Sequence, residues 1–256
     1  MKFRPCIDIH NGKVKQIVGG SLKDVGDAAK ENFVSEQDAA FYANLYREAG
    51  IKGGHVILLN NSSSPYFKDT KDQALLALRA YPGGLQLGGG VCPENAKEYL
   101  DVGASHVIVT SYVFIDGRIS WDNLRKMEEA VGKKNLVLDL SCRRKDDQYY
   151  IVTDRWQKFT EVPVTLEVMN QLGEHCDEFL VHAVDVEGKA NWIETELAAL
   201  LAEYDGRPVT YAGGIGSKKD LENLKIYGNG RLDVTVGSAL DLFGGTISFQ
   251  ELVKLS

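Results

Sequence analysis

The chain has 256 residues, of which 44% are hydrophobic and 25% are charged, and its formal net charge is −7 at pH 7. This composition is typical of a folded globular protein, and the negative charge argues against nucleic acid and anionic membranes as partners. No segment approaches the about 18 consecutive apolar residues that a membrane-spanning helix needs.

Short apolar segments alternate with helical patterns along the whole chain. The apolar segments are continuous rather than alternating, as in parallel strands that are buried on both faces. Eight strand–helix units in a chain of this length predict an α/β fold, a (β/α)8 TIM barrel that forms one domain over residues 1–256. An open doubly wound sheet is the alternative, but it leaves two exposed edges. The predicted strands are residues 3–9, 55–60, 85–88, 106–110, 136–140, 178–183, 208–212 and 233–237.

Helix-start signals support this division. Residues 35–38 (Ser-Glu-Gln-Asp) resemble a capping box, which predicts a helix that Gly50 ends and in which Ala39, Tyr42, Ala43 and Tyr46 share one face. Pro93 suits the first turn of a later helix, and Ser217 can cap another.

Two long segments, residues 13–34 and 141–164, follow the first and fifth strands at equivalent places. Long loops on a barrel are usually lids or binding loops, although simple surface excursions remain the alternative.

Three features of the first half recur in the second half in the same order. Each separation is close to half of the 256 residues, which indicates two half-barrel repeats, about 1–130 and 131–256. The repeated features are an aspartate after an apolar segment, a glycine turn, and a small hydroxyl residue after an apolar segment: Asp8 and Asp139, Gly88–Gly90 and Gly213–Gly214, Thr110–Ser111 and Gly237–Ser238.

The two aspartates are candidate catalytic residues. Carboxylates at the ends of barrel strands project into the mouth where barrel active sites lie, and a pair of them in different environments can give and take protons. The alternative is that each caps a turn or pairs with a nearby lysine or arginine. His182 and Asp185, at the end of the sixth strand, are possible helpers, and a structural role for His182 is equally consistent with the sequence.

The glycine turns predict two phosphate sites. Backbone N–H groups at such turns and at helix N-termini bind phosphate, as they do after strands 7 and 8 of many barrels. Each glycine pair alone can be a simple tight turn, but the repetition favours a small-molecule substrate with two phosphates. The predicted phosphate-binding residues are Gly89, Gly90, Thr110 and Ser111 in the first half and Gly213, Gly214, Gly237 and Ser238 in the second.

The four cysteines are scattered and form no C-x-x-C pair, which argues against a disulfide framework and a structural zinc site. Residues 1–9 enter an apolar strand without the pattern of a targeting leader, so we expect a cytoplasmic protein with reduced thiols.

Residues 5–14 (Pro-Cys-Ile-Asp-Ile-His-Asn-Gly-Lys-Val), the two glycine turns and the Gly237–Ser238 step together resemble the barrel isomerases of histidine biosynthesis, in particular their eukaryotic members. The resemblance extends over essentially the whole chain. It implies an Amadori rearrangement of an aminoaldose ribotide to the aminoketose, with no cofactor and no metal.

Residue roles follow from the same resemblance. Asp8 corresponds to the base and Asp139 to the acid, although the sequence leaves this assignment open. Trp156 corresponds to a tryptophan that stacks on the carboxamide imidazole, and we expect Arg143, in the same segment, to bind substrate as well. One half-repeated chain is sufficient to build the site, so we expect a monomer, without excluding a dimer.

The chain departs from the bacterial pattern after the sixth strand, where residues 181–188 lack the helper threonine of the bacterial enzymes. Two other functions remain open. One is the ammonia-using cyclase barrel of the same pathway, whose members usually begin Cys-Leu-Asp-Val where this chain has Cys6-Ile7-Asp8-Ile9. The other is a barrel that binds phosphorylated sugars without catalysis, which would leave the paired aspartates unexplained.

Overall fold

Eight parallel strands form a closed barrel in a computed structural model that describes residues 1–18, 21–22, 28–190 and 192–255. A parallel bridge between Phe3 and Val234 joins the first and last strands, where the Arg4 N–H donates to the Val234 carbonyl over 2.8 Å. This closure confirms the predicted barrel and excludes the open sheet. In spatial order the strands are β15 (Asp233–Thr235), β14 (Val209–Ala212), β13 (Glu178–His182), β9 (Leu136–Asp139), β6 (His106–Val109), β5 (Leu85–Gly88), β4 (Gly54–Leu58) and β1 (Cys6–His10).

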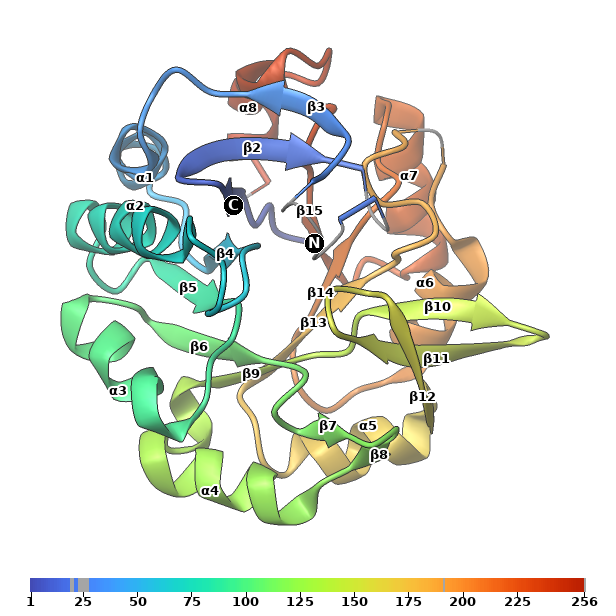
Figure 1. Cartoon of the computed structure of the whole chain (residues 1–256). Coiled ribbons are helices and arrows are strands. Elements are labelled where there is room, and N and C mark those ends of the chain that lie inside the picture. Colours follow the sequence, from blue (N-terminus) through green and yellow to red (C-terminus); the bar gives the residue numbers. More distant parts are fainter. Residues whose placement is uncertain (19–20, 23–27, 191, 256) are drawn as a thin grey trace.

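The α-helices surround the strands as an outer ring (Figure 1). Their inner faces are apolar, and the predicted face of α1 is buried as expected. Among the described residues no helix has the length and apolar character needed to span a membrane. The helices are α1 (Ala39–Glu48), α2 (Phe67–Ala80), α3 (Pro93–Val102), α4 (Trp121–Val131), α5 (Leu166–Gly173), α6 (Thr195–Glu203), α7 (Lys218–Tyr227) and α8 (Phe249–Val253), with two short 3-10 turns, η2 (Lys133–Asn135) and η3 (Asp241–Phe243).

The helix-start signals are mostly confirmed. Pro93 is in the first turn of α3, and the Ser217 side chain accepts from Asp220 N–H at the start of α7. The cap of α1 is Asp38, however, which accepts from Phe41 N–H over 2.9 Å, so the expected capping box at Ser35 is wrong. The Ser35 hydroxyl instead accepts from Gln37 N–H and shapes the turn before the helix.

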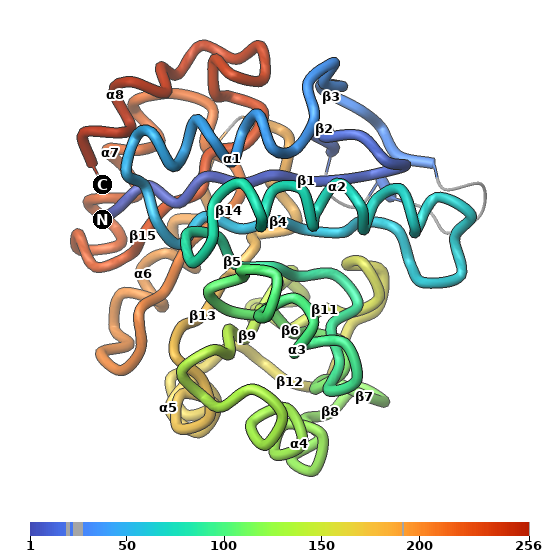
Figure 2. The backbone as a smooth tube through the Cα atoms, turned by 90° about the vertical axis from the view of Figure 1, so that its left-hand side faces the viewer, coloured from blue at the N-terminus to red at the C-terminus, as the bar shows by residue number. Residues whose placement is uncertain are grey.

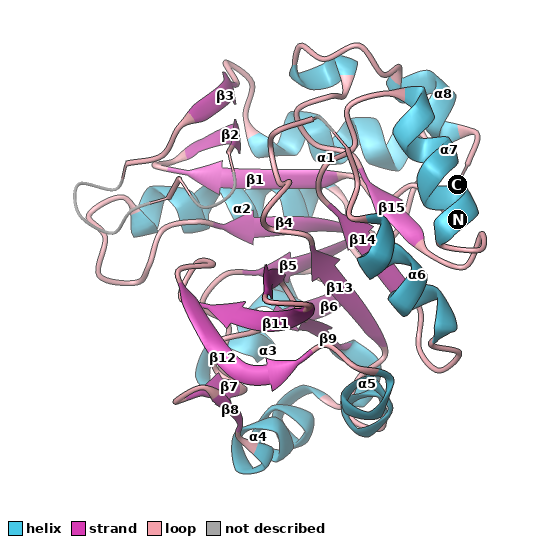
Figure 3. Ribbon diagram, turned by 90° about the vertical axis from the view of Figure 1, so that its right-hand side faces the viewer, coloured by secondary structure: helices cyan, strands magenta, loops and turns pink. Residues whose placement is uncertain are grey.

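Both long segments expected as loops contain strands of their own. In the first, β2 (Lys13–Ile17) pairs antiparallel with β1 and with β3 (Glu31–Val34). The second is a three-stranded antiparallel sheet of β10 (Cys142–Lys145), β11 (Gln148–Thr153) and β12 (Lys158–Pro163), beside a short hairpin of β7 (Phe114–Ile115) and β8 (Arg118–Ile119). Strands β2 and β3 lie away from the two chain termini, toward the opposite end of the molecule (Figure 2 and Figure 3).

The barrel interior is layered. An apolar layer of Ile108, Val137, Leu180 and Ala212 fills its centre, with Ile57 packed against it. Below this layer, near the amino ends of the strands, Glu178 accepts from the Gln86 amide and lies 3.7 Å from the Arg4 guanidinium. Above it, at the carboxyl ends, the interior is polar and contains the candidate site.

Candidate active site

A cavity of about 780 Å³ opens at the carboxyl ends of the strands. It is large enough for a metabolite-sized ligand, because small-molecule sites occupy about 300–1,000 Å³. Its position matches the catalytic face of barrel enzymes. Asp8, Asp139, His182, Trp156 and the first glycine turn all line this cavity, so the structure brings together most of the residues singled out in the sequence.

Asp139 is the last residue of β9 and is held by several donors. Its Oδ1 accepts from both the N–H and the hydroxyl of Ser141, over 2.8 and 2.7 Å, and its Oδ2 accepts from the Thr110 hydroxyl over 3.2 Å. The His182 Nδ1 lies 3.4 Å from Oδ1. Burial raises the pKa of Asp139, but the His182 charge and the hydrogen bonds from His182 and Ser141 outweigh it and leave the pKa below its ordinary value. Asp139 is therefore a carboxylate at neutral pH.

His182, the last residue of β13, is the cation that matches this carboxylate. Burial lowers the pKa of His182, but the charge and hydrogen bond of Asp139, together with the charges of Glu187 and Asp8, outweigh this effect and raise the pKa to about 9. The imidazolium is thus present at neutral pH. Its ring also faces Trp156, with ring centroids 5.6 Å apart.

Ser141 connects these groups, and the sequence reasoning did not identify it. The indole Nε1 of Trp156 donates to the Ser141 hydroxyl over 3.0 Å, and the same oxygen lies 3.2 Å from His182 Nδ1. Since Ser141 also donates to Asp139, one hydroxyl fixes the tryptophan, the histidine and the carboxylate. The only sequence signal was its place two residues after an aspartate, where a side chain can close a local turn.

Asp8 lies in a different environment. It is in the middle of β1, because this strand continues to His10, so its predicted place at a strand end is wrong by two residues. Its side chain accepts a long hydrogen bond from Gln16 Nε2, at 3.4 Å. Burial, followed by the charge of Glu187, raises the pKa of Asp8 to about 7. Asp8 can therefore exchange a proton near neutral pH, whereas Asp139 stays ionised.

Glu187, in the segment after β13, is a second residue that the sequence reasoning missed. Burial raises its pKa, and within the described part of the chain its buried Oε2 atom has no hydrogen-bond partner. Within the same described residues, the buried Thr235 hydroxyl also has no hydrogen-bond partner. Both residues line a smaller pocket together with Asp8 and the second glycine turn, so polar atoms without partners face the predicted second phosphate site.

The first glycine turn opens directly to the large cavity. Gly89 and Gly90 have φ values of 104° and 68°, and a Cβ on Gly89 would collide with the backbone of Leu58. Position 89 therefore needs glycine, because of its positive φ and because of the Leu58 backbone beside it. Thr110 and Ser111 line the same cavity, and Ser111 accepts from the Asp154 N–H over 3.2 Å.

The second glycine turn is more enclosed. Gly213, Gly214, Gly237 and Ser238 line the smaller pocket, whose volume is about 20 Å³, the room of roughly one water molecule. The backbone of Trp192 lies against Gly214 so closely that a Cβ there would collide with its carbonyl. The Trp192 backbone thus lies over the second turn, which is why the space beside this turn is small.

Arg143 and Asp185 do not line either pocket. They pair with each other instead: Arg143 Nε donates to Asp185 over 2.8 Å, and the Arg144 N–H donates to the same carboxylate over 3.0 Å. This pair joins β10 to the segment after β13. It therefore links the two segments that border the cavity.

The histidine biosynthesis protein family matches residues 2–248 of the chain. A chloroplastic imidazole-4-carboxamide isomerase of Medicago truncatula is 53% identical, with 99% of this chain and 81% of the relative covered. Imidazole-4-carboxamide isomerases of Neurospora crassa and Saccharomyces cerevisiae are 44% and 40% identical, with 99% and 96% of this chain and 97% and 94% of the relatives covered. The chain belongs to the histidine biosynthesis protein family.

Proposed function

We propose that this chain is a phosphoribosylformimino-5-aminoimidazole carboxamide ribotide isomerase, which converts a bis-phosphorylated aminoaldose to the aminoketose in histidine biosynthesis. The observation that supports this proposal most directly is that two carboxyl groups at the same end of the barrel differ in pKa. Asp139 is held ionised beside a cationic His182, and Asp8 titrates near neutral pH. The names of the relatives support the same reaction.

The first step needs a proton at the ribose ring oxygen. Ring opening then gives a protonated Schiff base at C1′. We assign this donation to the pair of Asp139 and His182, because the exchangeable proton of the resting pair is on His182. The resemblance assigns the acid role to Asp139 alone, and we propose that His182, rather than Asp185, takes the helper role of the bacterial threonine.

The second step removes the proton from C2′. We assign it to Asp8, whose pKa of about 7 gives a substantial fraction of carboxylate at neutral pH and a base strong enough to act. The electron pair of the C2′–H bond forms the enolamine and neutralises the Schiff base. Protonation at C1′ and loss of the hydroxyl proton then yield the ketone, so atoms and charge balance without an external reactant.

The substrate phosphates are assigned to the two glycine turns, and Trp156 to the imidazole. Holding a substrate at both ends orients the reacting carbon between the two catalytic groups. Arg143 and Asp185 are assigned to the border of the cavity, where their ion pair positions the segments that close over substrate.

We propose a monomer. All four cysteines are unpaired, which supports a reducing compartment such as the cytoplasm.

The test is conversion of the aminoaldose ribotide by the purified chain without added ammonia or metal. Formation of the ketose, followed by chromatography and NMR, is the expected result. If consumption of ligand required ammonia, the cyclase function would replace this proposal. If the ligand bound tightly and no product formed over hours, a binding function would replace it.

A further inference from the structure

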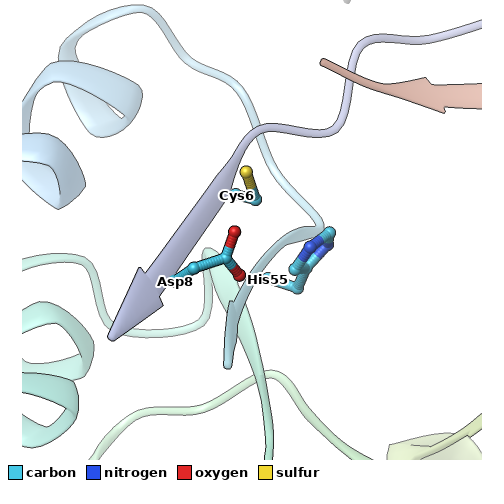
Figure 4. Close-up of side chains that lie close together, drawn as sticks. All are labelled: Cys6, Asp8 and His55. Atoms are coloured by element: carbon cyan, nitrogen blue, oxygen red, sulfur yellow. The ribbon is translucent and has the colours of Figure 1, made fainter. Parts of the chain in front are cut away.

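Three side chains with metal-binding atoms converge beside the cavity floor. The Cys6 Sγ, an Asp8 carboxylate oxygen and a His55 ring nitrogen all lie within 4.8 Å of one another. Figure 4 shows the Asp8 carboxylate between the Cys6 sulfur and the His55 imidazole. Cys6 and Asp8 lie two residues apart on the same face of β1, and His55 is on β4, which pairs with β1 so that Cys6 is opposite His55. The register of two neighbouring strands therefore creates the cluster.

His55 is the unusual member of this cluster. It is only 2% exposed, and its ring contacts the His182 ring edge-to-face, with ring centroids 5.8 Å apart. The ring lines the smaller pocket, where an imidazole nitrogen can bind a metal ion.

An amide and a further carboxylate surround the cluster. The Gln16 amide Nε2 lies 3.6 Å from the Cys6 sulfur and 3.4 Å from the Asp8 carboxylate, so both atoms already face one donor. Glu187 adds a further carboxylate to the same pocket. The opposing charge is His182, but its imidazolium is paired with Asp139. The pocket of about 20 Å³ has room for one bare ion.

We propose that Cys6, Asp8 and His55 form a site for a zinc ion, and that bound zinc inhibits the enzyme by occupying Asp8. A thiolate, an imidazole and a carboxylate select zinc rather than magnesium or calcium, and zinc sites with three protein ligands keep water as the fourth. The Cys6 thiol releases its proton to solvent when its sulfur binds, which leaves a ligand set whose two negative charges match the ion. The side chains need only small rotations, since ligand atoms around zinc are about 3.5 Å apart.

The zinc site (the binding half of the proposal) is inferred from the geometry of its three side chains. Inhibition by zinc (the inhibition half) rests in addition on the proposed role of Asp8. Cobalt(II) reports the binding half, because a thiolate–cobalt bond gives an intense near-ultraviolet charge-transfer band. We expect this band when cobalt is added to the reduced, metal-free protein, and its loss when zinc is added. Cys6→Ser should abolish the band, and His55→Gln should weaken cobalt binding by about tenfold or more, since even outer partners of a metal contribute that much.

Cys92→Ser is the matched control, because this partly exposed cysteine at the start of α3 is not in the cluster. Circular dichroism confirms that each variant is folded, and His55→Gln tests the site if Cys6→Ser fails to fold. Absence of the band in wild type, its persistence in Cys6→Ser, or its loss in Cys92→Ser would overturn the site.

The inhibition half is measured as the ratio of isomerase rates with and without zinc, each variant against its own rate. Wild type and Cys92→Ser should slow strongly and recover with a chelator, whereas Cys6→Ser should change little. A wild-type protein that gives the cobalt band but is not slowed by zinc would overturn the inhibition while leaving the site. A protein with no isomerase activity at all would overturn the proposed function, and the cobalt result would be unaffected.

Discussion

Asp139 and His182 end two neighbouring strands of the barrel, β9 and β13, and their side chains meet with 3.4 Å between Oδ1 and Nδ1. Each stabilises the charged form of the other, since the pKa of Asp139 is lowered and that of His182 is raised to about 9. The two side chains form an ion pair that lines the cavity. The His182 imidazolium and the Asp8 carboxyl group are the two groups that titrate in the proposed mechanism.

The pH dependence of kcat/KM should be bell-shaped. The acidic limb reflects ionisation of Asp8, whose pKa is about 7, and the alkaline limb reflects loss of the His182 proton near pH 9. Steady-state rates between pH 5 and 10 measure both limbs. His182→Gln should lose the alkaline limb and keep the acidic one, and an alkaline limb unchanged in that variant would contradict the assignment.

Ser141→Ala should lower kcat by about 10-fold to 100-fold, because one hydrogen bond to a charged group contributes about 1.5–3 kcal/mol. The variant removes the hydroxyl that donates to Asp139 and accepts from Trp156. The pKa of Asp139 should rise as well, which NMR titration measures. Ser105→Ala is the control, because its hydroxyl bonds the Leu85 carbonyl at the opposite end of the strands and should leave kcat unchanged.

His182 should make stability depend on pH. Its folded pKa of about 9 is above the ordinary 6.5, so its stabilising contribution is complete below about pH 6.5 and is lost as the pH rises through 9. The difference in unfolding free energy between wild type and His182→Gln should therefore be largest near pH 6 and shrink by pH 10. Urea unfolding at several pH values measures it, and a difference that does not vary with pH would refute the pair.

Gly89→Ala should raise KM and lower the melting temperature. Its φ of 104° disfavours any side chain, and the added Cβ would displace the Leu58 backbone beside the first phosphate site. Gly83→Ala is the matched control: its φ is 72°, but nothing lies within 4 Å of the added carbon. Gly83→Ala should cost stability alone, so equal KM changes in the two variants would exclude a phosphate role for the turn.

Much of this arrangement could be predicted from the sequence because barrel strands are continuous apolar segments and glycine turns have few alternatives. The eight strands, the closure and the convergence of Asp8, Asp139 and His182 followed from that pattern. Ser141 could not be predicted, because its role depends on a turn that directs its hydroxyl toward both Trp156 and Asp139.

Other features depend on which strands become neighbours. His55 is the first residue of the predicted strand 55–60, and the pairing of β1 with β4 buries it beside Cys6. Likewise, Arg143 and Asp185 are 42 positions apart and pair only because their segments meet at the barrel rim. Glu187 gives no local signal, since its effect on Asp8 arises across the smaller pocket.

The most direct test of the mechanism uses substrate labelled with deuterium at C2′. Wild type should form the ketose with loss of the label to solvent, because Asp8 removes that hydrogen. Asp8→Asn should bind the substrate, retain the label and slow turnover by about 10²-fold to 10⁴-fold, the usual contribution of a general base. If Asp8→Asn formed ketose and released deuterium at close to the wild-type rate, Asp8 would not be the base and the central claim would be wrong.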